Sequence, residues 1–133
     1  TSLMHGITVD ADAIPDLVPI IAVMLCFCRG ESKIINAGRL RLKESDRLRA
    51  TASELSRLGA NIYEGSDYLK IVGSQALCGN TVSAWNDHRI AMAAAIAASR
   101  CEGGVGITGA LQAVKKSYPD FFDDYRALGG NVR

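Results

Sequence analysis

Lysines, arginines and a histidine gather where helices are expected to begin. In chain order they are Arg39, Arg41, Lys43, Arg47, Arg49, His88, Arg89, Lys115 and Lys116. A helix N-terminus carries partial positive charge, so each cation placed there costs roughly 0.3 kcal/mol or more. A negative group is therefore expected to compensate, and three such helix starts brought together would bind a polyanion. The alternative is a set of solvated surface charges with local partners such as Asp46 and Asp87.

Two carboxylates lie close to these cations in the sequence. Asp16 falls in the first turn of an expected helix, and Glu44 directly follows Lys43. A carboxylate beside a bound substrate can donate or accept a proton. Without further information, Asp16 is better explained as a first-turn charge that the helix dipole favours. A protein that only binds an anion has no need of carboxylates at that position.

The elements that must position these residues alternate between strands and helices. Apolar periodicity with proline and glycine boundaries predicts strands at 7–9, 32–36, 61–64, 68–72, 81–85 and 105–108, and helices at 15–29, 45–58, 87–100 and 119–128. Asn86 is the expected N-cap of the third helix. The order βαβαββ followed by βαβα predicts an internally repeated α+β domain, with one unit at about residues 7–73 and a second, partial unit at about 79–133.

Composition narrows the class of protein and its partners. The 133 residues are 48% hydrophobic, enough for one compact core, and the net charge of +1 argues against nucleic acid or an anionic membrane as partner. The longest apolar stretch, residues 17–28, is too short to span a bilayer. The four cysteines lack metal-ligand spacing, so reduced, buried thiols in a cytoplasmic protein are expected, with no metal and no cofactor. The chain runs directly into strand-like sequence and is expected to be a piece of a longer protein.

Four segments resemble signatures of one enzyme family, the shikimate 3-phosphate enolpyruvyl transferases (3-phosphoshikimate 1-carboxyvinyltransferases). Residues 41–47 (RLKESDR) resemble the family's RxKESDR segment, and residues 86–92 (NDHRIAM) its NDHRxAM segment. Residues 116–119 (KSYP) and 14–16 (IPD) are similar to two further family segments. All four occur in the family's order, and they cover only the C-terminal portion of the family's sequence.

The resemblance implies a fold and a reaction. The fold is the family's inside-out barrel of repeated βαβαββ units, of which this chain would be part. The enzyme transfers the enolpyruvyl group of phosphoenolpyruvate to the 5-hydroxyl of shikimate 3-phosphate and releases phosphate, a step of aromatic amino acid biosynthesis. Both substrates are anions, as the cationic helix starts require.

The resemblance also implies roles for three residues in catalysis. Asp16 matches the carboxylate that contacts the shikimate hydroxyl and would act as its base. Glu44 matches the family's candidate for proton exchange at C3 of phosphoenolpyruvate. Lys43 matches the lysine between the two substrates, where a compact positive charge stabilises phosphate and a developing alkoxide.

Arg47, Arg89 and Lys116 match the family's phosphoenolpyruvate ligands, since guanidinium groups bind carboxylate and phosphate in bidentate fashion. His88 is secondary, either assisting proton movement or orienting a neighbour. At Arg39 some members carry an asparagine that contacts shikimate 3-phosphate, so Arg39 is expected to depart from that contact.

Two other functions compete with this one. The related transferase that uses a UDP-linked amino sugar, UDP-N-acetylglucosamine enolpyruvyl transferase, has the same architecture but lacks the paired KESDR and NDHR segments. A non-catalytic module that binds a phosphorylated ligand is a second alternative.

The family's active site also needs an early lysine, serine and glutamine residues and another arginine, all from the missing N-terminal part. This chain alone is therefore expected to fold without catalysing the reaction.

Overall fold

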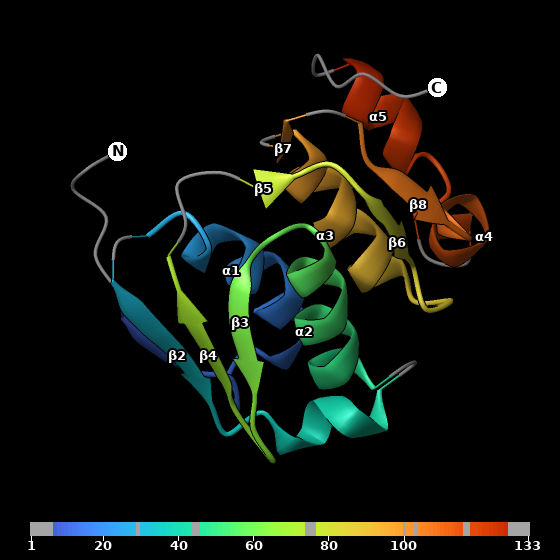
Figure 1. The fold of residues 1–133 in the computed structure, drawn as a ribbon. Helices are drawn as coiled ribbons and strands as arrows, with labels where there is room; N and C mark the ends of the chain where they lie inside the picture. Colours follow the sequence, from blue (N-terminus) through green and yellow to red (C-terminus); the bar gives the residue numbers. More distant parts are fainter. Residues whose placement is uncertain are drawn as a thin grey trace.

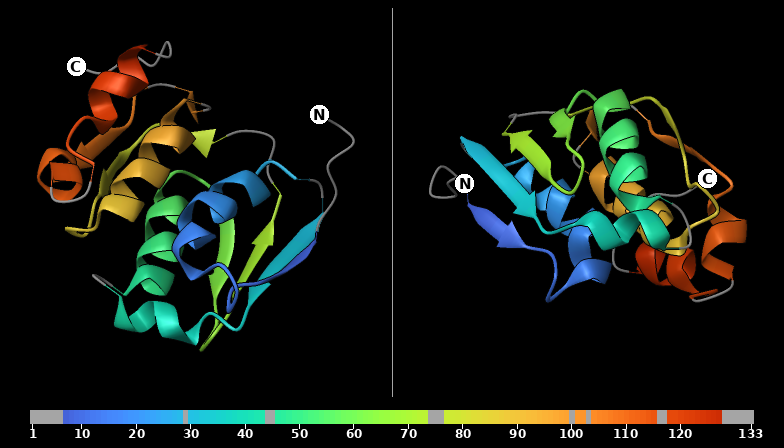
Figure 2. Two further views of the ribbon diagram at one scale, coloured as in Figure 1. Left: turned by 180° about the vertical axis from the view of Figure 1, so that it is seen from behind. Right: turned by 90° about the horizontal axis from the view of Figure 1, so that it is seen from below.

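A four-stranded sheet with helices packed on one face forms the first part of the chain, and a second group of helices and short strands lies beside it (Figure 1). The computed structural model describes residues 7–28, 30–43, 46–73, 77–99, 101–102, 104–115 and 118–127. Both groups share α3 (His88–Ala98), which contacts α1 (Val18–Leu25) on one side and α4 (Ala110–Lys115) on the other. Figure 2 shows this layering from behind and from below.

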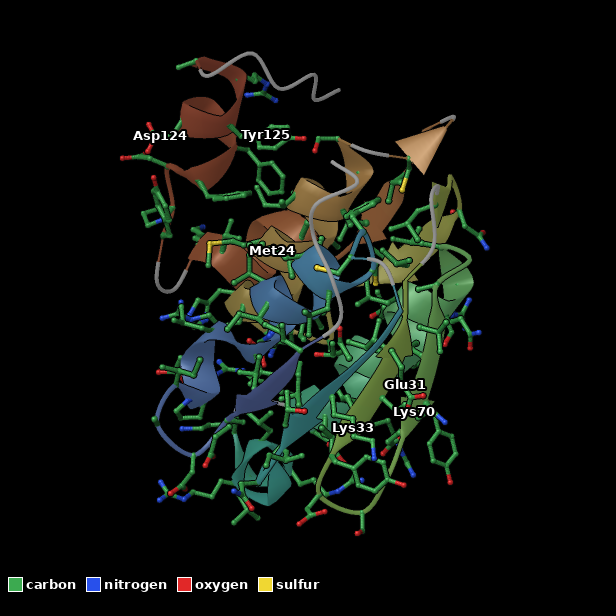
Figure 3. All side chains as sticks on the ribbon, turned by 90° about the vertical axis from the view of Figure 1, so that its left-hand side faces the viewer. Met24, Glu31, Lys33, Lys70, Asp124 and Tyr125 are labelled. Carbon is green, nitrogen blue, oxygen red and sulfur yellow. The ribbon has the colours of Figure 1, made fainter. Side chains whose placement is uncertain are left out.

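The first group has the order βαβαββ. Its elements are β1 (Thr8–Asp10), the 3-10 helix η1 (Pro15–Leu17), α1, β2 (Glu31–Ile35), the 3-10 helix η2 (Gly38–Leu42), α2 (Arg47–Arg57), β3 (Asn61–Glu64) and β4 (Leu69–Val72). The strand order is β1-β2-β4-β3, with β1 parallel to β2 and β4 antiparallel to both of its neighbours. The outer face of this sheet is polar, with Lys33, Glu31 and Lys70 on it and an ion pair of 3.6 Å between Lys70 and Glu31 (Figure 3).

The helix expected at 15–29 is divided and shorter in the structure. Pro15 opens η1, and α1 follows from Val18 with Pro19 in its first turn, where no backbone donor is required. The helix ends at Leu25, since the N–H groups of Phe27 and Cys28 turn to carbonyls three residues back at 3.1 and 3.2 Å. The i→i−3 bonds tighten the last turn and stop the helix before position 29.

The second helix follows its predicted pattern. In α2 the apolar residues Leu48, Ala52 and Leu55 are buried, and Asp46 caps the helix by accepting the Arg49 N–H at 3.0 Å. Beyond its end, Gly59 adopts a left-handed φ of 92°, as a helix-terminating glycine should. The strands predicted at 61–64 and 68–72 then form an antiparallel hairpin of β3 and β4.

The second group contains short elements around α3. They are β5 (Leu77–Cys78), β6 (Thr81–Ser83), β7 (Cys101–Glu102), β8 (Gly106–Thr108), α4 and α5 (Phe121–Ala127). Parallel pairs form between β5 and β7 and between β6 and β8. The sequence did not predict η2, β5, β7 or α4, and α5 begins two residues later than expected. None of these unpredicted elements is long enough for an apolar period to be visible.

Alanines allow α3 to belong to two cores. Ala93, Ala94 and Ala97 join the main core under the four-stranded sheet, while Ala91 and Ala95 face a smaller core with Phe122 and other residues of α4 and α5. The Tyr125 hydroxyl on α5 donates to the Ala95 carbonyl at 3.0 Å (Figure 3). In the described part of the chain, no helix has the length and apolarity needed to cross a membrane.

Candidate functional site

Arg47, the first residue of α2, is buried although it carries a charge. Its side chain is 2% exposed, and its guanidinium forms a bidentate pair with Asp87, with Nε 2.8 Å from Oδ2 and Nη2 3.1 Å from Oδ1. Its third nitrogen, Nη1, donates to Asp16 Oδ1 at 3.0 Å. Two carboxylates thus supply the negative charge that a cation at a helix start requires.

Asp87 connects the two helix starts. It has no exposed surface, and besides Arg47 its Oδ1 accepts the backbone N–H of Arg89 at 3.0 Å, which makes it the N-cap of α3. The prediction that Asn86 is the N-cap of this helix is wrong. Trp85 and Asn86 both take left-handed φ values, 55° and 51°, and this turn carries Asp87 inward to the cap position.

Asp16 lies between two cations at the surface end of this arrangement. Its side chain is 53% exposed, with Arg47 Nη1 at 3.0 Å and Lys43 Nζ at 3.7 Å. Asp16 belongs to η1 and Lys43 directly follows η2, so two 3-10 helices place them. The side chains of Lys43, Asp16, Arg47 and Asp87 form a row of alternating charge that runs from solvent into the core. We call it the charge row.

Arg89 and His88 occupy the first turn of α3, next to the inner end of the charge row, and both are half-buried. Within the described part of the chain, no hydrogen bond or ion pair engages the Arg89 guanidinium, so its donors are available to an anion. The helix starts that carry Arg47 and Arg89 therefore meet at Asp87. These are two of the three helix starts that the sequence predicted to lie together. Lys116 and Glu44 lie outside the described residues, so this structure does not place them.

Neighbouring charged residues have partners of their own. Arg39 makes an ion pair of 3.0 Å with Asp12, and both side chains are exposed. Trp85 lines a hollow of about 350 Å³ together with Arg57 and several polar residues of β6 and α2. No residue of the charge row lines this hollow, so the hollow lies apart from the proposed chemistry.

Sequence reasoning did not identify the importance of Asp87, which was considered only as a local partner of surface charges. Its partner Arg47 is forty residues away in the chain, and the pairing depends on α2 and α3 packing side by side. The available signal was its position, immediately before a helix whose first turn holds two basic residues. That position predicts a cap but does not predict burial.

Comparisons with known proteins place the chain among enolpyruvyl transferases. A family model described as EPSP synthase (3-phosphoshikimate 1-carboxyvinyltransferase) matches residues 1–125. The chain is 55% identical over 128 residues to the 3-phosphoshikimate 1-carboxyvinyltransferase of Clostridium acetobutylicum and 55% identical over 131 residues to that of Clostridium novyi. These matches cover 96% and 98% of the chain but only 30% of each relative.

The fold agrees with these relatives. A solved structure of EPSP synthase from Acinetobacter baumannii superposes with a TM-score of 0.87 and 27% identity, over 97% of this chain and 31% of that one. The chain therefore has the α+β fold of part of that enzyme, and it spans about a third of the length of the proteins it matches.

Proposed function

Because the chain belongs to the EPSP synthase (3-phosphoshikimate 1-carboxyvinyltransferase) family, we propose that it supplies one side of an active site for enolpyruvyl transfer. In that reaction the enolpyruvyl group of phosphoenolpyruvate moves to the 5-hydroxyl of shikimate 3-phosphate, and phosphate is released. The observation that carries the proposal is the charge row, which holds the half-exposed carboxylate of Asp16 between Lys43 and Arg47, next to the helix start that carries Arg89.

Arg89 is the principal ligand of phosphoenolpyruvate in this proposal. Its guanidinium can bind a carboxylate or phosphate in bidentate fashion, and the start of α3 adds favourable dipole charge. Arg47 has Nε and Nη2 on Asp87, so an anion reaches it from the Nη1 side, where Asp16 lies. Lys116, by its family match, is the third ligand.

Proton transfer falls to the carboxylates. As the 5-hydroxyl oxygen bonds to C2 of phosphoenolpyruvate, the hydroxyl loses its proton and C3 gains one; C3 then loses a proton as the C2–phosphate bond breaks. Asp16 is half-exposed and can accept the hydroxyl hydrogen bond, and Lys43, 3.7 Å away, stabilises the developing alkoxide. Glu44, by its family match, exchanges the C3 proton.

The test uses the full-length enzyme that contains this segment. We expect Arg89→Ala to raise the KM for phosphoenolpyruvate about 10- to 150-fold, since a charge-assisted hydrogen bond contributes about 1.5 to 3 kcal/mol. Arg57→Ala is the control, because Arg57 is an exposed arginine paired with Glu54 outside the charge row. An unchanged KM in Arg89→Ala, or loss of the folded state, would contradict the assignment.

The same assay separates the alternatives. Replacing shikimate 3-phosphate by UDP-N-acetylglucosamine should give no transfer, and transfer to it would favour the related enzyme. Binding of phosphoenolpyruvate without transfer to either acceptor would favour a non-catalytic module.

The isolated chain should bind phosphoenolpyruvate weakly and show no turnover, because the rest of the enzyme supplies the remaining ligands. The free thiols of Cys26 and Cys28 support a cytoplasmic location.

A further inference from the structure

The 3-10 helix η2 is fastened at both ends to the turn between β3 and β4. Before η2, the Ala37 N–H donates to the Asp67 carbonyl at 2.7 Å. Near its end, Arg41 donates from Nε to the Ser66 carbonyl at 3.1 Å and from Nη2 to the Gly65 carbonyl at 2.8 Å. These bonds join residues more than twenty positions apart, so the hairpin turn determines where η2 lies.

The turn that receives these bonds is tightly packed. The Gly65 N–H donates to the Tyr68 carbonyl at 2.8 Å, closing the turn. A Cβ added to Gly65 would lie 2.1 Å from the ring of Tyr68, a distance that no real Cβ contact reaches. The aromatic ring therefore packs directly on the glycine, and the two carbonyls that Arg41 uses are held in place.

Arg41 also bonds two carboxylates on the other side. Its Nη1 lies 2.9 Å from Asp46 Oδ2 and 2.8 Å from Glu64 Oε2, and all three side chains are partly exposed, at 25% to 29%. The hydrogen bonds that Arg41 donates to Glu64 and then to Asp46 are the main causes that raise the pKa of Arg41 above its ordinary value. Asp46 uses its other oxygen to cap α2. The Arg41–Asp46 pair thus closes the chain between η2 and α2 into a loop, with Lys43 inside it and Arg47 directly after it.

We propose that Arg41 is a positioning residue for enolpyruvyl transfer. It holds this loop against the β3–β4 turn through its four hydrogen-bonded contacts, which we call the clasp, and so fixes Lys43 and Arg47 relative to Asp16. The inference rests on the proposed function for the roles of Lys43 and Arg47. Arg41 itself is engaged by four protein acceptors, and neither Lys43 nor Arg47 is among them. It acts through the position of the loop.

The geometry requires an arginine. Arg41 bonds with all three guanidinium nitrogens, to acceptors on β3, on the hairpin turn and at the start of α2. A lysine ammonium is a single point charge with three donors, so it can pair with a carboxylate but cannot span the turn and the helix start together. Arg41→Lys should therefore keep part of the clasp, and Arg41→Gln should lose it.

The experiment measures steady-state kinetics and hydrogen exchange in the full-length enzyme. In Arg41→Gln we expect kcat to fall by about 10²-fold with the KM for phosphoenolpyruvate changed less than about threefold, because misplacement of a catalytic group by about 1 Å costs this much in rate. Arg41→Lys should recover part of the kcat. The matched control is Arg49→Gln, since Arg49 also reaches Glu64, but at 4.0 Å from an exposed side chain outside the loop. Its kinetics should equal those of the wild type.

Amide hydrogen exchange tests the clasp without reference to activity. The amides of Leu42, Lys43 and Asp46 should exchange at least about tenfold faster in Arg41→Gln and at the wild-type rate in Arg49→Gln. Glu64→Gln, which keeps Arg41, should accelerate the same amides more weakly and serves if Arg41→Gln does not fold. Unchanged exchange in Arg41→Gln and Glu64→Gln, or a kcat of Arg41→Gln within twofold of the wild type, would overturn the proposal. A wild-type enzyme without transfer activity would instead refute the proposed function, and the exchange result would still decide the clasp.

Discussion

Replacing Asp87 by asparagine should destabilise the chain strongly although the shape of the side chain hardly changes. Asp87 has no exposed surface and shares two hydrogen bonds with Arg47, whose side chain is 2% exposed. Asparagine removes the negative charge and turns one acceptor into a donor that faces the guanidinium. The buried guanidinium then relies on Asp16, a carboxylate that is half in solvent.

The magnitude follows from which contacts are lost. Removing one partner of a buried ion pair costs roughly 3 to 5 kcal/mol. Asparagine caps helices as well as aspartate does, so the bond from the Arg89 N–H can survive and the expected loss lies near 3 kcal/mol. Alanine loses the cap as well, which adds about 1 kcal/mol.

Urea unfolding followed by tryptophan fluorescence measures this effect, because Trp85 is the single tryptophan and lies two residues before Asp87. The control is Asp12→Asn, which breaks the exposed pair with Arg39 and should change the free energy of unfolding by less than about 0.5 kcal/mol. A double-mutant cycle with Arg47→Leu should give a coupling of about 2 kcal/mol or more.

The reasoning would be refuted by a loss below about 1 kcal/mol in Asp87→Asn. Additive effects of Asp87→Asn and Arg47→Leu would refute it too, since removing the second partner of a real buried pair should cost much less than removing the first. Either result would mean that water reaches the pair and screens it.

Two further predictions concern the core. Thr51→Val should raise the free energy of unfolding by about 1 kcal/mol in urea titrations, because the buried Thr51 hydroxyl has no partner among the described residues. A lower free energy of unfolding would instead mean that the hydroxyl binds a water in the adjoining cavity of about 20 Å³. Burial, and then the neighbouring Cys28, raise the pKa of Cys26 from 9.0 to about 12. Below pH 9 both states keep the thiol proton, and above it only the folded state does, so stability should fall by about 1.4 kcal/mol per pH unit toward pH 12. Parallel pH–stability curves for wild type and Cys26→Ala would contradict this.

Elements with a repeating apolar pattern were predictable from the sequence, and those held by distant contacts were not. The spacing of Leu48, Ala52 and Leu55 predicts α2, and the Gly65-containing turn predicts the hairpin of β3 and β4. By contrast, η2 has no such pattern. Its position depends on Arg41 and on the bond from Ala37 to Asp67, both directed at a turn that lies far along the chain.

The candidate site divides in the same way. The types of its residues and their places at helix starts were visible in the sequence, and so was the need for negative charge beside Arg47. The choice of Asp87 and Asp16 as the partners was not visible, because it requires α2 to pack against α3 and η1 to lie near the start of α2. Pairing over forty residues is a property of the packed helices, which no local pattern records.

The buried pair of Arg47 and Asp87 is better explained by geometry than by stability. Replacing a buried ion pair with well-packed apolar residues is often neutral or stabilising, since the cost of removing two charges from water offsets most of their attraction. What the pair provides here is a fixed guanidinium, because two nitrogens of Arg47 are bound to a carboxylate that is itself tied to the start of α3. A positive charge held in place before the substrate arrives needs no reorganisation during the reaction. The same carboxylate therefore caps one helix and orients the first residue of another, so that Arg47 and Arg89 keep a constant relation to each other.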